Sequence, residues 1–387
     1  MAADAKLVRM LLPLPLAPRL ASFFFAYFAY AGVALAYFPL YLAARGLQPG
    51  EIAFLVALPY MARTFAPAAW GWLADATGAR RGIVVFSCGA AAAGFLLIPH
   101  IGGVAGIAAL VGALALLSAG AVPIVEAITL GSLAGQIGRY GPIRVWGSVG
   151  FIVATFGGGA WLDYWPATTL PHVLAALSLV ALVAALALPA APQRMSAGGD
   201  APRISVGVGA LLAAGFCMSA AHGTLYTFFT LYLELAGHSG MVIGGLWTLG
   251  VLAEIVVFLC LPVLFGRHSL SAILLVSFAC AIARFIAIGW LPPSLWILVP
   301  AQLLHAATFG AFHAASVAAV HRLFPESAQA RGQTLFSSLS YGAGGAAGAL
   351  IAGWAWETSG SAMAFSASAA AAAVGACFAY RLKRIGL

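Results

Sequence analysis

Charge is scarce in this sequence. Only 7% of its 387 residues are Asp, Glu, Lys or Arg, whereas 63% are hydrophobic, and the mean hydropathy is +1.02. A soluble domain carries roughly 25% charged residues because its surface has to face water. This chain cannot cover such a surface, and its apolar stretches recur from end to end. The composition therefore excludes a soluble fold and indicates a membrane protein.

Cysteine is also sparse, and its placement argues against a disulfide framework or a zinc site. The five cysteines all lie in apolar runs, and none belongs to a CxxC pair, so we expect free thiols. His305, His313 and His321 are evenly spaced, eight residues apart. That spacing separates them by about 12 Å along a helix, whereas zinc ligands lie within about 2.1 Å of one ion. We therefore expect no metal site, and three histidines with separate roles.

Enzyme motifs are absent from the sequence. It contains no HExxH, no nucleophile elbow and no nucleotide-binding loop with its lysine, so we expect neither an enzyme nor an organic cofactor. The net charge of +8 does not indicate nucleic-acid binding, because the positive residues separate apolar runs instead of forming one basic face. At the N-terminus, Lys6 and Arg9 lead directly into a full-length apolar run without a cleavable signal pattern.

Twelve apolar runs fill the chain between glycine, proline and charged residues. We place them at 19–43, 50–73, 82–99, 103–134, 141–162, 168–189, 206–234, 240–264, 270–290, 295–321, 330–356 and 361–381. A membrane-spanning helix needs about 20 residues, so each run is long enough. We predict an all-α integral membrane protein with twelve transmembrane helices in two six-helix bundles.

A polar stretch, APQRMSAGGDAPR at 191–203, halves the chain. We predict a first bundle at 1–190, a cytoplasmic linker at 191–205 and a second bundle at 206–387. Six helices plus six is the layout of a parallel-repeat transporter. Two glycine-rich stretches, GSVGFIVATFGGG and YGAGGAAGALIAG, follow arginines at equivalent places of the two halves and agree with an internal repeat.

The lysines and arginines predict an orientation. With both termini in the cytoplasm, all 18 of them fall on the cytoplasmic side except Arg45, Arg63 and Arg284. This asymmetry favours an even number of helices. We expect a multi-pass protein of the bacterial inner membrane that contacts lipid, functions as a monomer and binds a small molecule.

The loop GWLADATGARR between the second and third runs matches the major facilitator pattern G-x-x-x-D-x-x-G-x-R-[RK]. The matching residues are Gly71, Asp75, Gly78, Arg80 and Arg81. Gly78 permits a sharp turn, Asp75 can accept hydrogen bonds from a helix N-terminus across the interface, and the arginines can pair with acids or lipid phosphates. We interpret the loop as a cytoplasmic gate; an ordinary positively charged loop is the alternative.

Ionisable residues inside the membrane are costly and mark functional sites by default. Glu126 can pair with Arg144, and Glu254 can pair with Arg284, with His305 nearby. Paired charges cost less in a medium of low dielectric constant, and a proton or substrate can exchange with either partner. A purely structural ion pair is the alternative for each acid.

Arg63 has no obvious acidic partner, so we hypothesise that it attracts an anionic group of the substrate; a bond to helix carbonyls is the alternative. Further substrate-binding candidates are aromatic or imidazole side chains that could stack on a ring: Tyr27, Tyr30, His222, Tyr226 and Trp247. Packing or interfacial anchoring is the alternative for all of them.

Several stretches carry a resemblance to a known family: YGPIRVWGSVGF, HGTLYTFF, LWTLGVLAE and QLLHAATFGAFH. Through them the chain resembles, over nearly its whole length, the phenylpropionate permease group of the major facilitator superfamily. The resemblance implies a proton-linked uptake carrier with a central cavity between two six-helix domains.

A more distant similarity to lactose permease implies roles for single residues. PIVEAI followed by GPIRVWG resembles its sugar-binding segment and places those roles on Glu126 and Arg144. Arg284 and His305 match its coupling arginine and histidine. Two departures stand out: Thr308 replaces the acid one turn after the histidine, and Glu254 is displaced by about one turn.

Together these patterns predict a secondary transporter that imports a small organic solute, such as an aromatic carboxylate, with a proton. Arg63 and Arg144 are the candidates for the carboxylate. The candidates for proton coupling are Glu254, Arg284, His305 and His313. A proton-coupled sugar or nucleoside symporter and a drug or metabolite exporter are the alternatives.

Overall fold

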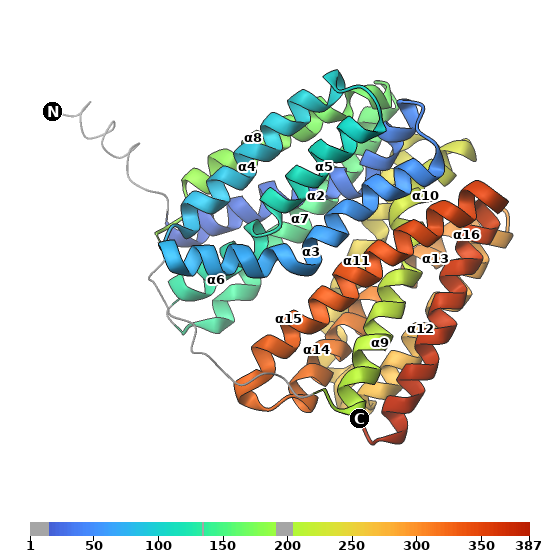
Figure 1. Cartoon of the computed structure of the whole chain (residues 1–387). Coiled ribbons are helices and arrows are strands. Elements are labelled where there is room, and N and C mark those ends of the chain that lie inside the picture. The colour runs from blue at the N-terminus through green and yellow to red at the C-terminus, as the bar shows by residue number, and fades with distance from the viewer. Residues whose placement is uncertain (1–14, 134, 191–203) are drawn as a thin grey trace.

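The computed structural model describes residues 15–133, 135–190 and 204–387 (Figure 1). Almost all of them are helical, and these described ranges contain no strand. Eleven helical stretches are long and apolar enough to cross a membrane. The last of these, residues 329–384, is too long for one crossing and is interrupted at Gly360, whose φ of 80° lies in the left-handed region that glycine adopts freely. The chain reverses there (Figure 1), so twelve segments cross and the predicted all-α membrane fold is confirmed.

The helices before residue 191 are α2 (Leu16–Ala44), α3 (Pro49–Thr77), α4 (Arg80–Leu97), α5 (Val104–Ser118), α6 (Ala121–Ser132), α7 (Tyr140–Leu162) and α8 (Leu170–Leu186). The helices after residue 203 are α9 (Val206–Ala221), α10 (Gly223–Leu235), α11 (Gly240–Arg267), α12 (Leu270–Trp290), α13 (Leu295–Leu303), α14 (Phe312–Leu323), α15 (Gln329–Ser337) and α16 (Gly345–Arg384). Two π-helices, η4 (Ala306–Ala311) and η6 (Ser338–Gly344), lie between α13 and α14 and between α15 and α16.

Four runs expected as continuous helices are locally interrupted, among them the run 330–356, which contains the π-helix η6. The run 103–134 divides near Gly120, where the absent side chain makes room for the Trp70 ring. The run 206–234 bends at His222, and the run 295–321 contains the π-helix η4. A membrane tolerates such breaks where neighbouring helices cover the loosened backbone. π-helical turns of this kind are frequent at functional sites.

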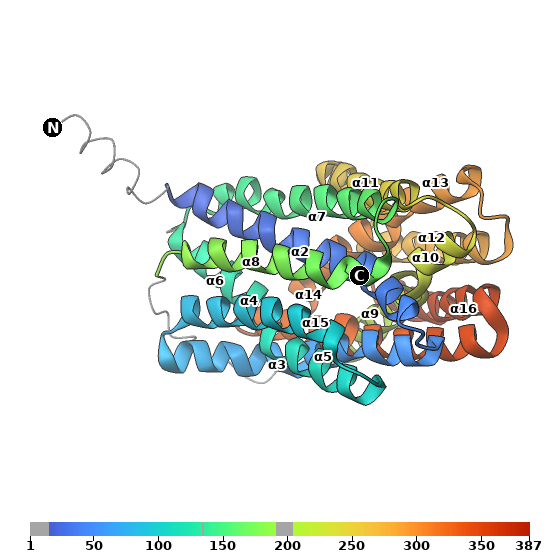
Figure 2. The same cartoon turned by 90° about the horizontal axis from the view of Figure 1, so that it is seen from above.

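The two parts of the chain, residues 15–190 (the first half) and 204–387 (the second half), meet along specific helices. Packing between them joins α7 to α11, α3 to α16 and α2 to α10. Figures 1 and 2 show the two groups of helices converging at one end and diverging toward the other. We call the converging end, marked by Gly50 and Gly240, the closed end, and the end marked by Gly78 the motif end. The predicted domain boundaries stay a prediction, and most of the predicted linker lies outside the described residues.

Candidate functional site

The gate-like loop forms the turn between α3 and α4. Gly78 ends α3 with a φ of 68°, which allows the reversal predicted from the sequence. Arg80 Nη2 lies 2.6 Å from Asp75 Oδ1, and Arg81 donates a hydrogen bond to the carbonyl of Leu186 on α8. These contacts hold the loop against its own half. The bond predicted from Asp75 to a helix N-terminus of the other half stays a prediction.

The first half brings Glu126 and Arg144 together, as the sequence suggested, but loosely. Arg144 Nε lies 3.8 Å from Glu126 Oε1, and Tyr140 donates a 3.5 Å hydrogen bond to the same oxygen. The guanidinium of Arg144 also lies 4.1 Å from the centre of the Phe28 ring. The two charged side chains keep 29% and 39% of their surface exposed. A pair this open can exchange partners with a bound ligand.

Arg63 lies near the middle of α3 at the boundary between the halves. The neighbouring Tyr60 and Thr64 face Gly345 and Gly342 of the second half so closely that a Cβ on either glycine would clash. Arg63 is exposed, and within the described ranges it makes no hydrogen bond or ion pair.

The charge of Arg63 reaches groups on both sides of this boundary. It is close enough to interact electrostatically with Glu126 of the first half and with His313 and Tyr341 of the second. The tertiary structure thus places between the two sets of candidate residues a cation that has no partner among the residues described.

The second half contains a buried polar network around Arg284 of α12, which is completely inaccessible. Arg284 Nη1 lies 2.8 Å from His305 Nδ1, and His305 Nε2 lies 2.8 Å from Glu254 Oε1. Arginine can only donate, so Nδ1 of His305 must accept and its proton must sit on Nε2. The imidazole therefore donates to the Glu254 carboxylate and links two opposite charges that do not touch.

Two further residues complete this network, and the sequence did not single out one of them. Gln302 Oε1 accepts a 2.7 Å hydrogen bond from Arg284 Nη2. Thr308 Oγ1 lies 3.2 Å from Arg284 Nη1 and 3.2 Å from His222 Nε2. Thr308 thus has a place in the network although it replaces an acid. A glutamine in an otherwise apolar run was the signal that could have identified Gln302.

The π-helix η4 connects two of the three evenly spaced histidines. The Phe309 ring stacks on His305 with centroids 5.5 Å apart and on His313 with centroids 6.2 Å apart. His313 Nδ1 lies 2.6 Å from the Tyr341 hydroxyl, whereas His321 is bonded to Gln329. The three histidines have separate polar partners, as expected. The spacing of the first two leaves room for the Phe309 ring between them.

A second stack lines the same region. The Tyr226 ring is stacked between His222, 5.6 Å away, and Trp247, 6.2 Å away. Tyr226 also lies edge-on to His305 at 6.5 Å. The structure thus joins the predicted aromatic candidates of the second half to its charged network. These rings therefore pack on one another beside the charged groups.

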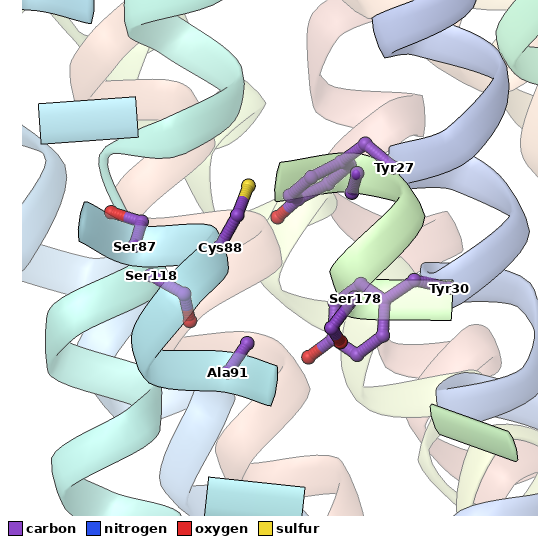
Figure 3. A pocket seen from close by; sticks show the side chains of 8 residues that line it. Tyr27, Tyr30, Ser87, Cys88, Ala91, Ser118 and Ser178 are labelled. Carbon is purple, nitrogen blue, oxygen red and sulfur yellow. The ribbon is translucent and has the colours of Figure 1, made fainter. Parts of the chain in front are cut away.

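Tyr27 and Tyr30 have a different setting. They line a small cavity inside the first half, together with Ser87, Cys88 and Ser178 (Figure 3). The cavity offers about 10 Å³ to the centre of a water-sized sphere, which is room for about one water. This cavity is too small for an organic solute, so the predicted contact of these two tyrosines with substrate stays a prediction.

Comparison with known sequences adds the following findings. A family model described as the MFS_1 like family matches residues 18–367. The probable 3-phenylpropionic acid transporter of Escherichia coli (strain K12) is 31% identical over 188 residues, which cover 46% of this chain and 48% of that protein. The match therefore spans about half the length of this relative. The maltose permease of Geobacillus stearothermophilus is 26% identical over 346 residues, 87% of this chain and 86% of that protein.

Solved structures share the same architecture. The nucleoside transporter NupG superposes with a TM-score of 0.82 at 17% identity, covering 96% of this chain and 99% of that one. A mutant of the peptide transporter POT gives a TM-score of 0.76 at 15% identity, covering 97% and 95%. At such identities the likeness concerns the fold alone.

Proposed function

This chain belongs to the MFS_1 like family, and from that premise we propose that it imports a small aromatic carboxylate together with a proton by alternating access. The chain is a transporter of small solutes and not an enzyme, because the family match and the named relatives agree on transport. The substrate class, the coupled proton and the direction are the content of the proposal.

The proposed substrate class rests on one observation, that Arg63 has no partner among the described residues. A cation inside a membrane needs a partner, and among the described residues Arg63 has none. A substrate carboxylate supplies that partner through two parallel hydrogen bonds. Arg144, which is partly exposed on the Phe28 ring, offers a second cation beside an aromatic surface.

Two observations support an aromatic ring in the substrate. The rings of Tyr226 and Trp247 in the second half stack on one another beside the charged network. A relative that matches nearly half of this chain is named a probable transporter of 3-phenylpropionic acid, which unites a phenyl ring and a carboxylate. A substrate whose carboxylate binds Arg63 and whose ring packs beside Tyr226 would contact both halves.

Proton coupling is assigned to the network of Glu254, His305 and Arg284. Glu254 and Arg284 carry opposite charges joined through the imidazole. A proton bound by Glu254 cancels the negative charge and leaves the buried Arg284 uncompensated, which makes this arrangement more costly. A conformation that exposes the network differently is then favoured, and the proton gradient can drive the change.

For the orientation we propose that the motif end faces the cytoplasm of a bacterium and the closed end faces outward. The distribution of lysine and arginine supports this placement, as does the bacterial origin of the named relatives. In the conformation described here the two halves then converge at the outward-facing end. We propose that a single chain in the inner membrane is the working unit.

The test is uptake into proteoliposomes of labelled 3-phenylpropionate. Uptake should require an inward proton gradient and should stop when an ionophore collapses it. Unlabelled aromatic acids should compete, and neutral sugars and nucleosides should not. Outward pumping against the same gradient, or uptake that ignores the gradient, would show the proposal to be wrong.

Sugar import is the second candidate, and a specific observation favours it. The match to maltose permease covers 87% of this chain, and the partly exposed pair of Glu126 and Arg144 can hydrogen-bond hydroxyl groups. Competition by maltose but not by 3-phenylpropionate in the same assay would select this candidate.

A further inference from the structure

A carboxylate at the end of α7 holds the start of α11 across the boundary between the halves. Asp163 Oδ1 accepts a hydrogen bond of 2.5 Å from the backbone N–H of Gly240, and Oδ2 accepts one of 2.9 Å from Met241. These N–H groups belong to the first turn of a helix, which has no internal acceptor for them. The helix dipole adds a favourable interaction with the negative charge.

A second carboxylate makes the equivalent contact in the opposite direction. Glu357, in the part of α16 before Gly360, accepts a 3.0 Å hydrogen bond from the backbone N–H of Gly50. Gly50 lies in the first turn of α3 in the first half. Each half thus sends one acid to the N-terminus of a helix in the other.

The two contacts lie at equivalent positions of the two halves. Counting crossing segments, α7 is the fifth and the α16 segment with Glu357 is the eleventh, whereas α3 is the second and α11 the eighth. Both the acids and their targets are therefore six segments apart. Two acids at unrelated surface positions would not be expected to follow this relation.

Close glycine packing accompanies each contact. A Cβ on Gly240 would lie 2.2 Å from the Gly159 carbonyl oxygen, and a Cβ on Gly353 would lie 2.3 Å from Cβ of Ala53. Gly159 and Gly353 come from the two glycine-rich stretches that the repeat places at equivalent positions. The absent side chains let the helices approach closely enough for the carboxylates to reach.

Further hydrogen bonds between described residues of the two halves accompany these contacts. Besides the two acids, Thr230 donates to the Ala36 carbonyl, and Thr248 lies 3.4 Å from the Thr155 hydroxyl. We propose that Asp163 and Glu357 are a matched pair of latches that hold the closed end shut and set the balance between the two transport conformations. The inference rests on alternating access from the proposed function, but not on any particular substrate.

The test measures this balance directly. Spin labels at His100 and Trp296, exposed residues at the closed end of either half, report opening there by double electron–electron resonance. Labels at Gly141 and Arg322 report the motif end in the same way. The five native cysteines are first replaced, and the full chain is measured in lipid nanodiscs without substrate, so the result does not depend on what is transported.

At the closed end, the spin-label distances distinguish molecules that have opened from molecules that remain shut. Asp163→Ala and Glu357→Ala should each raise the ratio of opened to shut molecules by about fivefold, as expected for loss of one helix cap. The double variant should exceed either single one, and the motif-end distance should shorten in the same molecules. Asp163→Asn and Glu357→Gln keep one oxygen acceptor and should give smaller shifts.

Matched controls lie on the same helix ends. Glu51 caps α3 from within its own half by accepting from the backbone of Gln48, and Ser239 caps α11 by accepting from Val242. Glu51→Ala and Ser239→Ala should change the ratio of opened to shut molecules at either end by less than about twofold, because neither side chain crosses between the halves.

Unchanged distributions in the four latch variants would overturn the proposal, as would controls that shift as much as they do. Opening at the closed end without shortening at the motif end would also overturn it, because it would reveal local fraying instead of a switch. If the alanine variants fail to fold, the Asn and Gln variants decide. If transport of aromatic acids is not found but these shifts are, only the substrate assignment fails.

Discussion

His305 Nε2 lies 2.8 Å from Oε1 of Glu254, in a pair that is about 90% buried on both sides. The other imidazole nitrogen faces Arg284 at 2.8 Å. Because the arginine can only donate, the histidine is a neutral bridge with its hydrogen toward the acid. A second proton on this imidazole would point at Arg284 and break the contact. The acid is therefore the better place for an incoming proton.

This geometry predicts the behaviour of Glu254→Gln. The amide still reaches His305 but cannot gain or lose a proton, so gradient-driven uptake should fall at least about tenfold. Exchange of labelled for unlabelled substrate across the membrane, which needs no net proton movement, should survive. Glu234→Gln, an exposed acid on α10, is the control and should behave like the parent. Normal gradient-driven uptake by Glu254→Gln would remove Glu254 from the coupling role.

Replacing Arg284 should affect stability as well as transport. Arg284→Ala leaves three buried acceptors, on Gln302, His305 and Thr308, without their donor, and it leaves the Glu254 charge without its counterpart. We expect a loss of about 3–5 kcal/mol in the free energy of unfolding, seen as a lower midpoint in thermal unfolding of the purified protein. Arg284→Lys keeps the charge but cannot span all three acceptors. Its unfolding midpoint should therefore lie between those of the parent and of Arg284→Ala. An unchanged midpoint for Arg284→Ala would contradict the network.

Arg63 should decide affinity for the charged part of the substrate. Arg63→Gln removes the unpaired cation, and binding of an aromatic carboxylate should weaken by about 10- to 100-fold, as for loss of a charge-assisted hydrogen-bonded pair. Arg63→Lys should recover part of the affinity. Binding of the corresponding uncharged amide, measured by calorimetry, should hardly change. Equal weakening for acid and amide would exclude the carboxylate role.

Gly240→Ala tests the close approach at the closed end. The new Cβ would lie 2.2 Å from a backbone oxygen of Gly159, which cannot rotate away, so the two halves must separate there. Uptake should drop severalfold while the protein still folds, because the strain exists only in the closed-end contact. Gly245→Ala on the same helix meets nothing within 4 Å and is the control. Similar uptake by both variants would show that this contact does not limit transport.

The sequence by itself determined the number and nature of the membrane segments. Scarce charge and long apolar runs leave the helix as the structure that satisfies the backbone within lipid, apart from a closed barrel. The same scarcity made each intramembrane charge conspicuous, so Glu126, Glu254 and Arg284 could be selected without a structure. Local breaks at Gly120 and His222 were missed, because packing between helices decides where a continuous apolar run bends.

Only the tertiary structure decided which of these groups meet. Glu254, displaced by about a turn from the position that the lactose permease resemblance implies, still reaches His305. Arg63 lies between the halves, a position that no local pattern encodes. The sequence analysis did not select Asp163 and Glu357, because their partners lie 77 and 307 residues away in the sequence. Secondary structure in a membrane follows from local composition, but contacts across the boundary between the two halves depend on how the halves pack.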